Sequence, residues 1–362
     1  MFSFPRLPYL EFANQYYINP KFDLASSNVP PFDLNKLKVN KDLVNVHPNI
    51  LLKNAISKIA NFYDANEAQV TIGPGVTGLY AALSSCFREI IVEKPGYEPL
   101  WQTPQGFRVN VKRFDRCNES GFYPNFNIEE IEKHITIDTG AVVITNPNNP
   151  TGKYICSDQL VELANFLETK NIYLIIDEIY LDFLFEIGKK SAFRLAKNII
   201  IVSSLNKVYG LGGLRLGWAV GPTAIIDKIN RAQVHLFGLP FGAGLSFNDS
   251  VLNSLELIKN NHTNRLKKRK AILHDIFNGP STMRWLPGDI NMIGLLEIKE
   301  ITKRKNITDQ NLVSKLIEKE QIIVAPGSFF GIPDHLRIGL GAMDDKGFEF
   351  GLARLKLFLE TF

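Results

Sequence analysis

Short apolar runs alternate with amphipathic helical patterns along most of this 362-residue chain. The runs that are typical of buried strands occupy residues 70–72, 89–93, 141–145, 173–177, 199–203 and 216–220. Apolar residues at helical spacing predict helices over 51–63, 78–87, 157–170 (with Ser157 as the N-cap) and 347–360. Because strands that alternate with helices form sheets covered on both faces, the pattern predicts an α/β fold with a mostly parallel sheet between helix layers.

The C-terminal part of the chain has a different pattern. Strand-like runs near 292–298, 322–325 and 336–338 alternate with two helical patterns, which predicts a smaller α+β domain. A helical pattern from 245 to 277 predicts one long helix that joins the two parts. We expect a large domain over 42–250 and a small domain built from both chain ends, 1–41 and 251–362.

Composition excludes several classes of protein. A net charge of +4 is too small to indicate a nucleic-acid-binding protein, and the basic run at 265–270 is predicted to be a solvated helix face. No apolar stretch is long enough to span a bilayer, and the first residues lack the basic region of a signal peptide. The three cysteines lack metal-ligand spacing. We therefore expect a cytoplasmic protein with no nucleic-acid, membrane or metal partner.

One glycine-rich stretch, residues 203–218, carries a lysine between an alcohol and an arginine. Lys207 is the amine, Ser204 precedes it, and Arg215 follows it. A lysine that attacks a carbonyl needs a confined, neutral amine, and the hydroxyl and guanidinium would bind an anion beside it. This pattern predicts a phosphate held next to a reactive lysine.

Polar residues also follow two of the predicted strands. The run 173–177 ends in Asp177 and is followed by Tyr180, and the run 141–145 is followed by NPNNPTG at 146–152, which includes Asn149. Ligands of open α/β sheets bind at the carboxyl ends of the strands. These side chains are therefore expected to lie at the same edge of the sheet as Lys207.

A second glycine motif favours another class of enzyme when taken alone. Residues 73–78 read G-x-G-x-x-G between a strand and a helix, and Glu93 ends the next strand, as in NAD-binding proteins. A dehydrogenase, however, gives no role to NPNNPTG or to Lys207. The amides of Gly75, Val76 and Thr77 at a helix N-terminus suit a cofactor phosphate equally well.

NPNNPTG, DEIY at 177–180 and SLNK at 204–207 followed by GLRLGW, in this order, resemble motifs of the pyridoxal phosphate-dependent aminotransferases of the aspartate aminotransferase superfamily (class I/II, fold type I). APGSFFG at 325–331 and HLRIGLG at 335–341 are similar to the family's C-terminal strands. LASSNVPPFDL at 24–34 is similar to the N-terminal segment of the histidinol-phosphate and arginine aminotransferase branches. The resemblance covers nearly the whole chain and implies a seven-stranded sheet.

The resemblance implies a role for each of these residues. Lys207 would form the Schiff base with pyridoxal 5'-phosphate and move the proton, and Asp177 would keep the pyridine nitrogen protonated. Tyr180 and Asn149 would bond the ring's phenolic oxygen, and Tyr97 would stack on the pyridine. Arg337, with Asn149, would clamp the substrate carboxylate. The phosphate would be bound by Gly75, Val76, Thr77, Ser204 and Arg215.

Other roles stay open for several residues. Lys207 as an exposed loop lysine, Asp177 as a strand-end cap, Tyr97 as a core aromatic and Arg337 as a structural ion-pair partner are the alternatives. His47 stands near the place where many relatives have a tyrosine that reaches the neighbouring subunit's phosphate, and a surface histidine is its alternative.

The expected reaction moves an amino group from an L-amino acid to a 2-oxo acid, and the resemblance implies a homodimer. Phe237 and Phe241 favour an apolar or aromatic amino donor, and histidinol phosphate stays open as a substrate. A decarboxylase or carbon–sulfur lyase on the same fold is the main alternative. A non-catalytic sensor module and an NAD-dependent dehydrogenase are more remote ones.

Overall fold

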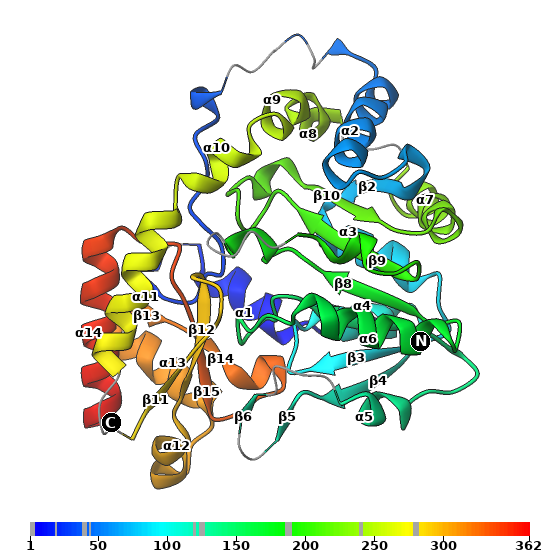
Figure 1. Cartoon of the computed structure of the whole chain (residues 1–362). Helices are drawn as coiled ribbons and strands as arrows, with labels where there is room; N and C mark the ends of the chain where they lie inside the picture. The colour runs from blue at the N-terminus through cyan, green and yellow to red at the C-terminus, as the bar shows by residue number, and fades with distance from the viewer. Residues whose placement is uncertain are drawn as a thin grey trace.

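A computed structural model describes residues 4–18, 20–37, 42, 45–118, 121–122, 127–184, 190–238, 242–277 and 282–362. Its centre is a seven-stranded sheet (Figure 1). The strands follow one another across the sheet in the order β2 (Val70–Pro74), β10 (Leu216–Val220), β9 (Ile199–Ser204), β8 (Tyr173–Asp177), β7 (Thr139–Thr145), β3 (Glu89–Lys94) and β4 (Asn110–Asp115). β10 is antiparallel to both of its neighbours, and the pairs from β9 to β4 are parallel, which confirms the predicted sheet.

Helices cover both faces of this sheet, since alternate residues of each strand point to opposite faces. Ile175 and Ile200 pack with α3 (Gly75–Ser84) and α7 (Thr223–Phe237) on one face. Ile176 and Ile201 belong to the cluster on the other face, which includes side chains of α2 and α6. The remaining helices of this part are α2 (Pro48–Tyr63), α4 (Pro99–Gly106), α5 (Ile128–Glu132) and α6 (Ser157–Glu168).

The predicted helices differ from the observed ones mainly at their starts. Ser157 is not the N-cap of α6, because Cys156 has the extended backbone of a cap and Ser157 is already helical. α3 begins at Gly75, three positions before the predicted start. Neither α7 nor the edge strand β4 was predicted. β4 is polar, with the sequence NVKRFD, and therefore lacks the apolar run of a buried strand.

The second part of the chain is built on an antiparallel sheet with the order β11 (Arg284–Pro287), β12 (Ile293–Glu297), β15 (His335–Gly339) and β14 (Ala325–Pro326). The predicted strand at 322–325 is split between two sheets, because β13 (Ile322–Ile323) pairs instead with β1 (Phe22–Asp23). Its helices are α1 (Pro8–Tyr16), α11 (Thr263–Phe277), α12 (Lys299–Lys305), α13 (Asp309–Glu320) and α14 (Asp345–Thr361). β5 (Cys117–Asn118) pairs antiparallel with β6 (Gly121–Phe122).

The single long helix predicted over 245–277 is wrong. The chain forms four helices there instead: α8 (Gly242–Ser246), α9 (Asn248–Leu252), α10 (Leu255–Asn260) and α11. The first break falls at Phe247, and the later ones fall at Asn253, Ser254, Asn261 and His262. Asn and Ser are weak helix formers because their side chains bond the backbone in other conformations.

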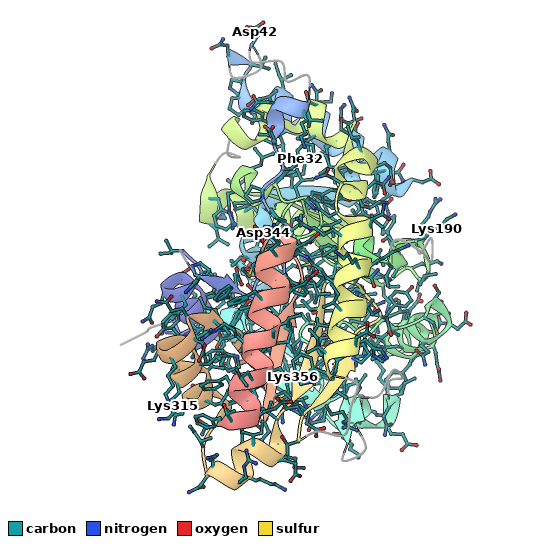
Figure 2. The ribbon with its side chains drawn as sticks, turned by 90° about the vertical axis from the view of Figure 1, so that its left-hand side faces the viewer. Phe32, Asp42, Lys190, Lys315, Asp344 and Lys356 are labelled. Carbon is teal, nitrogen blue, oxygen red and sulfur yellow. The ribbon has the colours of Figure 1, made fainter. Side chains whose placement is uncertain are left out.

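The basic run on α11 was predicted to be a solvated helix face, and this is wrong for Arg269. Arg269 is 1% exposed and donates to Asp345 Oδ1 at 3.0 Å and to the carbonyl of Leu340 at 2.6 Å. Further along, Lys356 Nζ donates to the carbonyl of Ile276 at 3.0 Å. These contacts hold α11 and α14 side by side (Figure 2).

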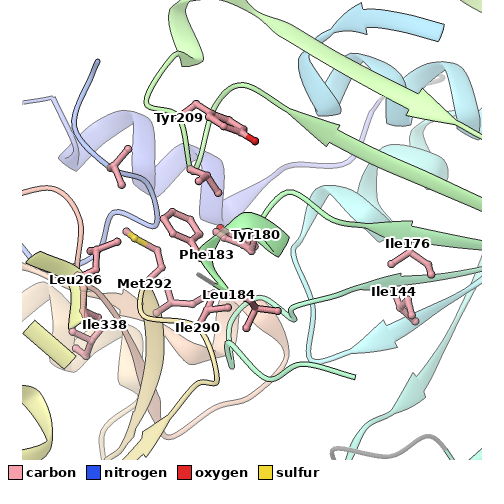
Figure 3. Close-up of a cluster of buried hydrophobic side chains, with 14 of the residues drawn as sticks. Ile144, Ile176, Tyr180, Phe183, Leu184, Tyr209, Leu266, Ile290, Met292 and Ile338 are labelled. Carbon is pink, nitrogen blue, oxygen red and sulfur yellow. The ribbon is translucent and has the colours of Figure 1, made fainter. Parts of the chain in front are cut away.

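The two parts share buried side chains behind the end of β8 (Figure 3). Phe183 and Leu184, from the segment that follows β8, meet Ile290 and Met292, which precede β12. Because packed apolar side chains fix their backbones closely, this contact sets the position of β15 relative to the carboxyl ends of the parallel strands. Within the described ranges, no helix is long and apolar enough to cross a bilayer.

Candidate active site

A pocket of about 640 Å³ opens at the carboxyl ends of the parallel strands. The ten residues predicted to bind the cofactor all line it: Gly75, Val76, Thr77, Tyr97, Asn149, Asp177, Tyr180, Ser204, Lys207 and Arg215. Six residues that were not predicted to line it complete the wall: Thr145, Ile179, Asn206, Leu211, Gly212 and Leu216. The structure thus brings motifs from across the chain into one site.

One end of the pocket is an anion cradle, formed by residues 75–77 with Ser204 and Arg215. Pro74 is the N-cap of α3 and provides no side-chain hydrogen bond, so the first turn keeps backbone N–H groups to donate. Gly75 has a φ of +76°, a conformation that favours glycine. A Cβ on Gly217 would lie 2.6 Å from the Gly75 carbonyl carbon, so only glycine allows this close approach.

Arg215 closes the cradle from the side of β10. Its Nη2 donates to the carbonyl of Pro74 at 3.3 Å, and a Cβ on Gly75 would lie 3.1 Å from that nitrogen. Ser204, at the end of β9, accepts from the backbone N–H of Asn206 at 3.3 Å. Helix dipole, guanidinium and hydroxyl together favour a phosphate-sized anion here.

Asp177 lies deeper, at the end of β8, and is 3% exposed. Burial raises the pKa of its carboxyl to about 7, although the Ile179 N–H donates to it at 3.0 Å and the Tyr80 hydroxyl at 3.2 Å. A buried carboxylate is stabilised by a cationic partner. The site is therefore suited to a protonated heterocyclic nitrogen. Tyr80 was not predicted as a site residue.

Lys207 contacts a residue from the start of the chain. Its Nζ lies 3.2 Å from Ser27 Oγ, and the Tyr180 hydroxyl donates to the same oxygen at 2.8 Å. The backbone N–H of Val29 donates to the carbonyl of Lys207 at 3.1 Å. The segment 24–34 was singled out by resemblance, but none of its residues was assigned to the site.

Behind Asn149, which lines the pocket, lies a cluster that we call the arginine end: Arg337 on β15 with Asn149, Tyr9 and Ala25. Arg337 is fully buried and donates through Nη1 to Asn149 Oδ1 at 3.0 Å. Its Nη2 donates to the Tyr9 hydroxyl at 2.9 Å and to the Ala25 carbonyl at 2.8 Å. The guanidinium also lies 4.7 Å from the ring centroid of Phe330, and its Nε has no partner among the described residues. Arg337 itself does not line the pocket but stands behind Asn149.

Tyr9, which sequence reasoning missed, brings α1 onto the arginine end. Its ring lies 5.9 Å from Tyr97 in an edge-to-face arrangement, and its backbone N–H donates to Glu98 Oε2 at 2.9 Å. Burial alone would raise the pKa of the Tyr9 hydroxyl, but the positive charges of Arg337 and Lys207 lower it below its usual value. In Figure 1, α1 lies between the two sheets.

Glu93 does not have the role that a dinucleotide site requires. Its Oε2 accepts from Arg116 Nη1 at 2.6 Å, its Oε1 accepts from the Thr145 N–H at 2.5 Å, and it is fully buried. Both carboxylate oxygens are thus used inside the protein, and none faces a ribose. The glycine motif at 73–78 instead serves the pocket that contains Lys207.

Two other predicted residues lie outside this pocket. His47 is exposed at the N-cap of α2, where its Nδ1 accepts from the Asn49 N–H at 3.2 Å. Phe237, at the end of α7, is 41% exposed and lines a neighbouring apolar pocket. Phe241 lies outside the described residues.

Known proteins are similar over almost the whole chain. The family model described as aminotransferase class I and II matches residues 24–355. Histidinol-phosphate aminotransferase 2 of Haemophilus influenzae (strain 86-028NP) is 32% identical over 301 residues, which are 80% of this chain and 75% of that protein. A histidinol-phosphate aminotransferase of Caldicellulosiruptor saccharolyticus is 25% identical over 359 residues, 94% and 93% of the two chains. A solved PLP-dependent aminotransferase from Streptococcus suis has the same fold, with a TM-score of 0.85, 20% identity and 99% of each chain covered.

Proposed function

Since the chain belongs to the class I and II aminotransferases, and is therefore a pyridoxal phosphate-dependent transaminase, we propose that Lys207 is the residue that carries its cofactor and its proton transfer. The observation that carries this proposal is the position of Lys207 in one pocket with Asp177, Arg215 and the start of α3. The anion cradle fits the cofactor phosphate, and the buried Asp177 fits a protonated pyridine nitrogen.

Each residue of the site then has its own proposed part in the reaction. When bound, pyridoxal phosphate supplies an electron sink for the electron pair left at the substrate Cα. Lys207 Nζ would accept the proton from the substrate Cα and hold it for its return. Asp177 stabilises the proton on the ring nitrogen, and Tyr180 and Asn149 hold the phenolic oxygen. Tyr97 would stack on the ring, and its place in the lining of the same pocket supports this role.

The arginine end is proposed to bind the substrate carboxylate. Arg337 has the planar donors that a carboxylate requires, and Asn149 already contacts it. Tyr9, Tyr97 and Phe330 gather beside it, which supports an L-amino acid with an apolar or aromatic side chain. The names of the two relatives make histidinol phosphate the second candidate donor, with a 2-oxo acid as acceptor.

The domain boundaries, the oligomeric state and the location of the protein are also proposals. We infer a large domain over 42–250 that binds the cofactor and a small domain from 1–41 and 251–362. A homodimer is proposed, with His47 of each chain reaching the cofactor phosphate of the other. A cytoplasmic location agrees with this metabolic role.

The absorbance spectrum of the protein with pyridoxal phosphate tests the function directly. We expect a visible band that single amino acids convert to a near-ultraviolet band and that a 2-oxo acid restores. Release of CO₂, or of a thiol without amine transfer, would instead identify a decarboxylase or lyase.

Lys207→Ala is expected to abolish turnover, because no other amine takes its place. Lys228→Ala, which changes an exposed lysine on α7, is the matched control and should keep full activity. Retained turnover in Lys207→Ala would contradict the assignment.

A further inference from the structure

A serine from the start of the chain lies against the reactive amine. Ser27 is 2% exposed, and its Oγ lies 3.2 Å from Lys207 Nζ and 2.8 Å from the Tyr180 hydroxyl. A hydroxyl has two lone pairs and one proton. Because Ser27 accepts from both neighbours, both lone pairs are used, and the oxygen links the amine to the phenol.

This contact restricts the direction of the amine. A neutral lysine amine has two N–H groups and one lone pair, and it rotates freely about the Cε–Nζ bond unless one of its hydrogens is held. A bond from one N–H to Ser27 restricts that rotation and therefore restricts where the lone pair points. Proton abstraction at carbon depends steeply on such alignment.

The serine is itself held in place through hydrogen bonds of the residues that precede it. Asp23 Oδ1 accepts from the N–H groups of Ala25 and Ser26, at 2.9 and 2.8 Å. The N–H of Leu24 donates to the Ile323 carbonyl at 2.9 Å. Ser27 thus stands on a rigid support rather than on a free loop.

We propose that Ser27 is a positioning residue for the proton transfer at Lys207: its hydroxyl holds the free amine of Lys207 in its working orientation. This proposal rests on the proposed function of Lys207. It assigns to the segment 24–34 a part in the chemistry in addition to its structural contacts.

Kinetics of the holoenzyme test the positioning. Ser27→Ala should lower kcat about tenfold with little change in KM, because alignment and not binding is lost. The kinetic isotope effect with an α-deuterated amino acid should rise, since proton transfer becomes slower than the other steps. Ser27→Thr keeps the hydroxyl and should recover most of the rate.

Two further variants separate positioning from structure. Ser27→Cys fills the same space with a weak acceptor and should behave like Ser27→Ala. Ser26→Ala removes a neighbouring hydroxyl that donates to Asp23 Oδ2 at 2.5 Å, and it should leave kcat and the isotope effect unchanged. An unchanged isotope effect in Ser27→Cys, or an equal rise in Ser26→Ala, would overturn the proposal.

The apoprotein gives a readout that does not depend on activity. Acetic anhydride should acetylate Lys207 about threefold faster in Ser27→Cys than in the wild type, since loss of a hydrogen-bond acceptor weakens the hold on the amine. Lys228 serves as the internal reference in peptide mass spectrometry. Equal labelling in the two proteins would show that Ser27 does not hold the amine. If the wild type fails to transaminate but the labelling differs, the proposed function is wrong and the contact is real.

Discussion

The anion cradle and the arginine end lie in the same site but are built from different parts of the protein. The cradle uses backbone N–H groups at the start of α3 and the exposed Arg215. These hydrogen-bond donors are available to a ligand without rearrangement. At the arginine end, Arg337 is fully buried and already bonded to Asn149, Tyr9 and Ala25. Under the proposed function, a substrate carboxylate would therefore have to replace hydrogen bonds that Arg337 makes within the protein. The proposed cofactor end would be preformed, and the proposed substrate end would have to exchange partners.

Asp177, between these two ends, offers the largest expected effect. Asp177→Asn removes the charge that stabilises the ring nitrogen, so kcat should fall about 10³-fold. Steady-state kinetics at saturating cofactor measure this loss. A fall of less than about tenfold would mean that the ring nitrogen does not depend on Asp177.

Asp177→Asn should also change how the stability of the apoprotein depends on pH. Because burial raises the pKa of Asp177 to about 7, above its unfolded value, its carboxyl contributes stability below about pH 4, and this is lost as the pH rises through 7. Asparagine does not titrate, so Asp177→Asn does not lose stability in this way as the pH rises. The apoprotein melting temperature of the wild type should therefore fall relative to the variant between pH 5 and pH 8.

Arg337→Ala should lower kcat/KM for amino acids about 100-fold, because a buried charged hydrogen-bond partner is removed. Cofactor affinity should stay nearly unchanged, since the cradle lies at the other end. Arg284→Ala, an exposed arginine on the same sheet, is the control. A large loss of cofactor affinity in Arg337→Ala would show that the arginine end also contributes to cofactor binding, so that the two ends are not independent.

Gly75→Ala should weaken cofactor binding about tenfold and leave the amino acid KM nearly unchanged. Alanine is strained at the φ of +76°, and its Cβ would lie 3.1 Å from Arg215 Nη2. Gly213→Ala is the matched control, because a Cβ there meets nothing within 4 Å. Fluorescence titration of the two apoproteins with pyridoxal phosphate measures the difference.

Tyr9→Phe should have the smallest effect and the opposite sign. Loss of the hydroxyl removes a competitor for Arg337, so the amino acid KM should fall about threefold, the equivalent of a weak hydrogen bond. Tyr16→Phe, on the same helix, should leave KM unchanged. A KM that rises in Tyr9→Phe would show that the hydroxyl binds the substrate instead of competing with it.

The two ends also differ in how far they could be predicted from the sequence. The cradle comes from two short stretches, 73–78 and 203–218, whose glycines and charges are visible in sequence. Arg337 was found only through the resemblance of its strand to known ones. Tyr9 lies 328 residues from Arg337, and Ser27 lies 180 residues from Lys207. No local pattern encodes such contacts, because they depend on how the two sheets pack together.

The fold, too, has elements that the sequence predicts and elements that it does not. Apolar runs predicted the central strands within one or two residues in most cases, since burial on both faces leaves an unbroken apolar signal. The split of the strand at 322–325 depends on the pairing of β13 with β1, a tertiary contact that no local pattern encodes. The breaks in the helix predicted over 245–277 fall mostly at weak helix formers, which a prediction from apolar spacing alone does not take into account.

The path of residues 22–32 has a consequence for the synthesis of the chain. The N–H of Leu24 bonds the Ile323 carbonyl, and its carbonyl accepts from the N–H of Gly339. At about 5–20 residues per second, the ribosome delivers these partners roughly 15–60 s after Leu24. The parallel sheet can form around Lys207 in the meantime, but Ser27 reaches the lysine only after the last strands emerge. In a nascent chain Lys207 therefore lacks its contact with Ser27 until translation is almost complete.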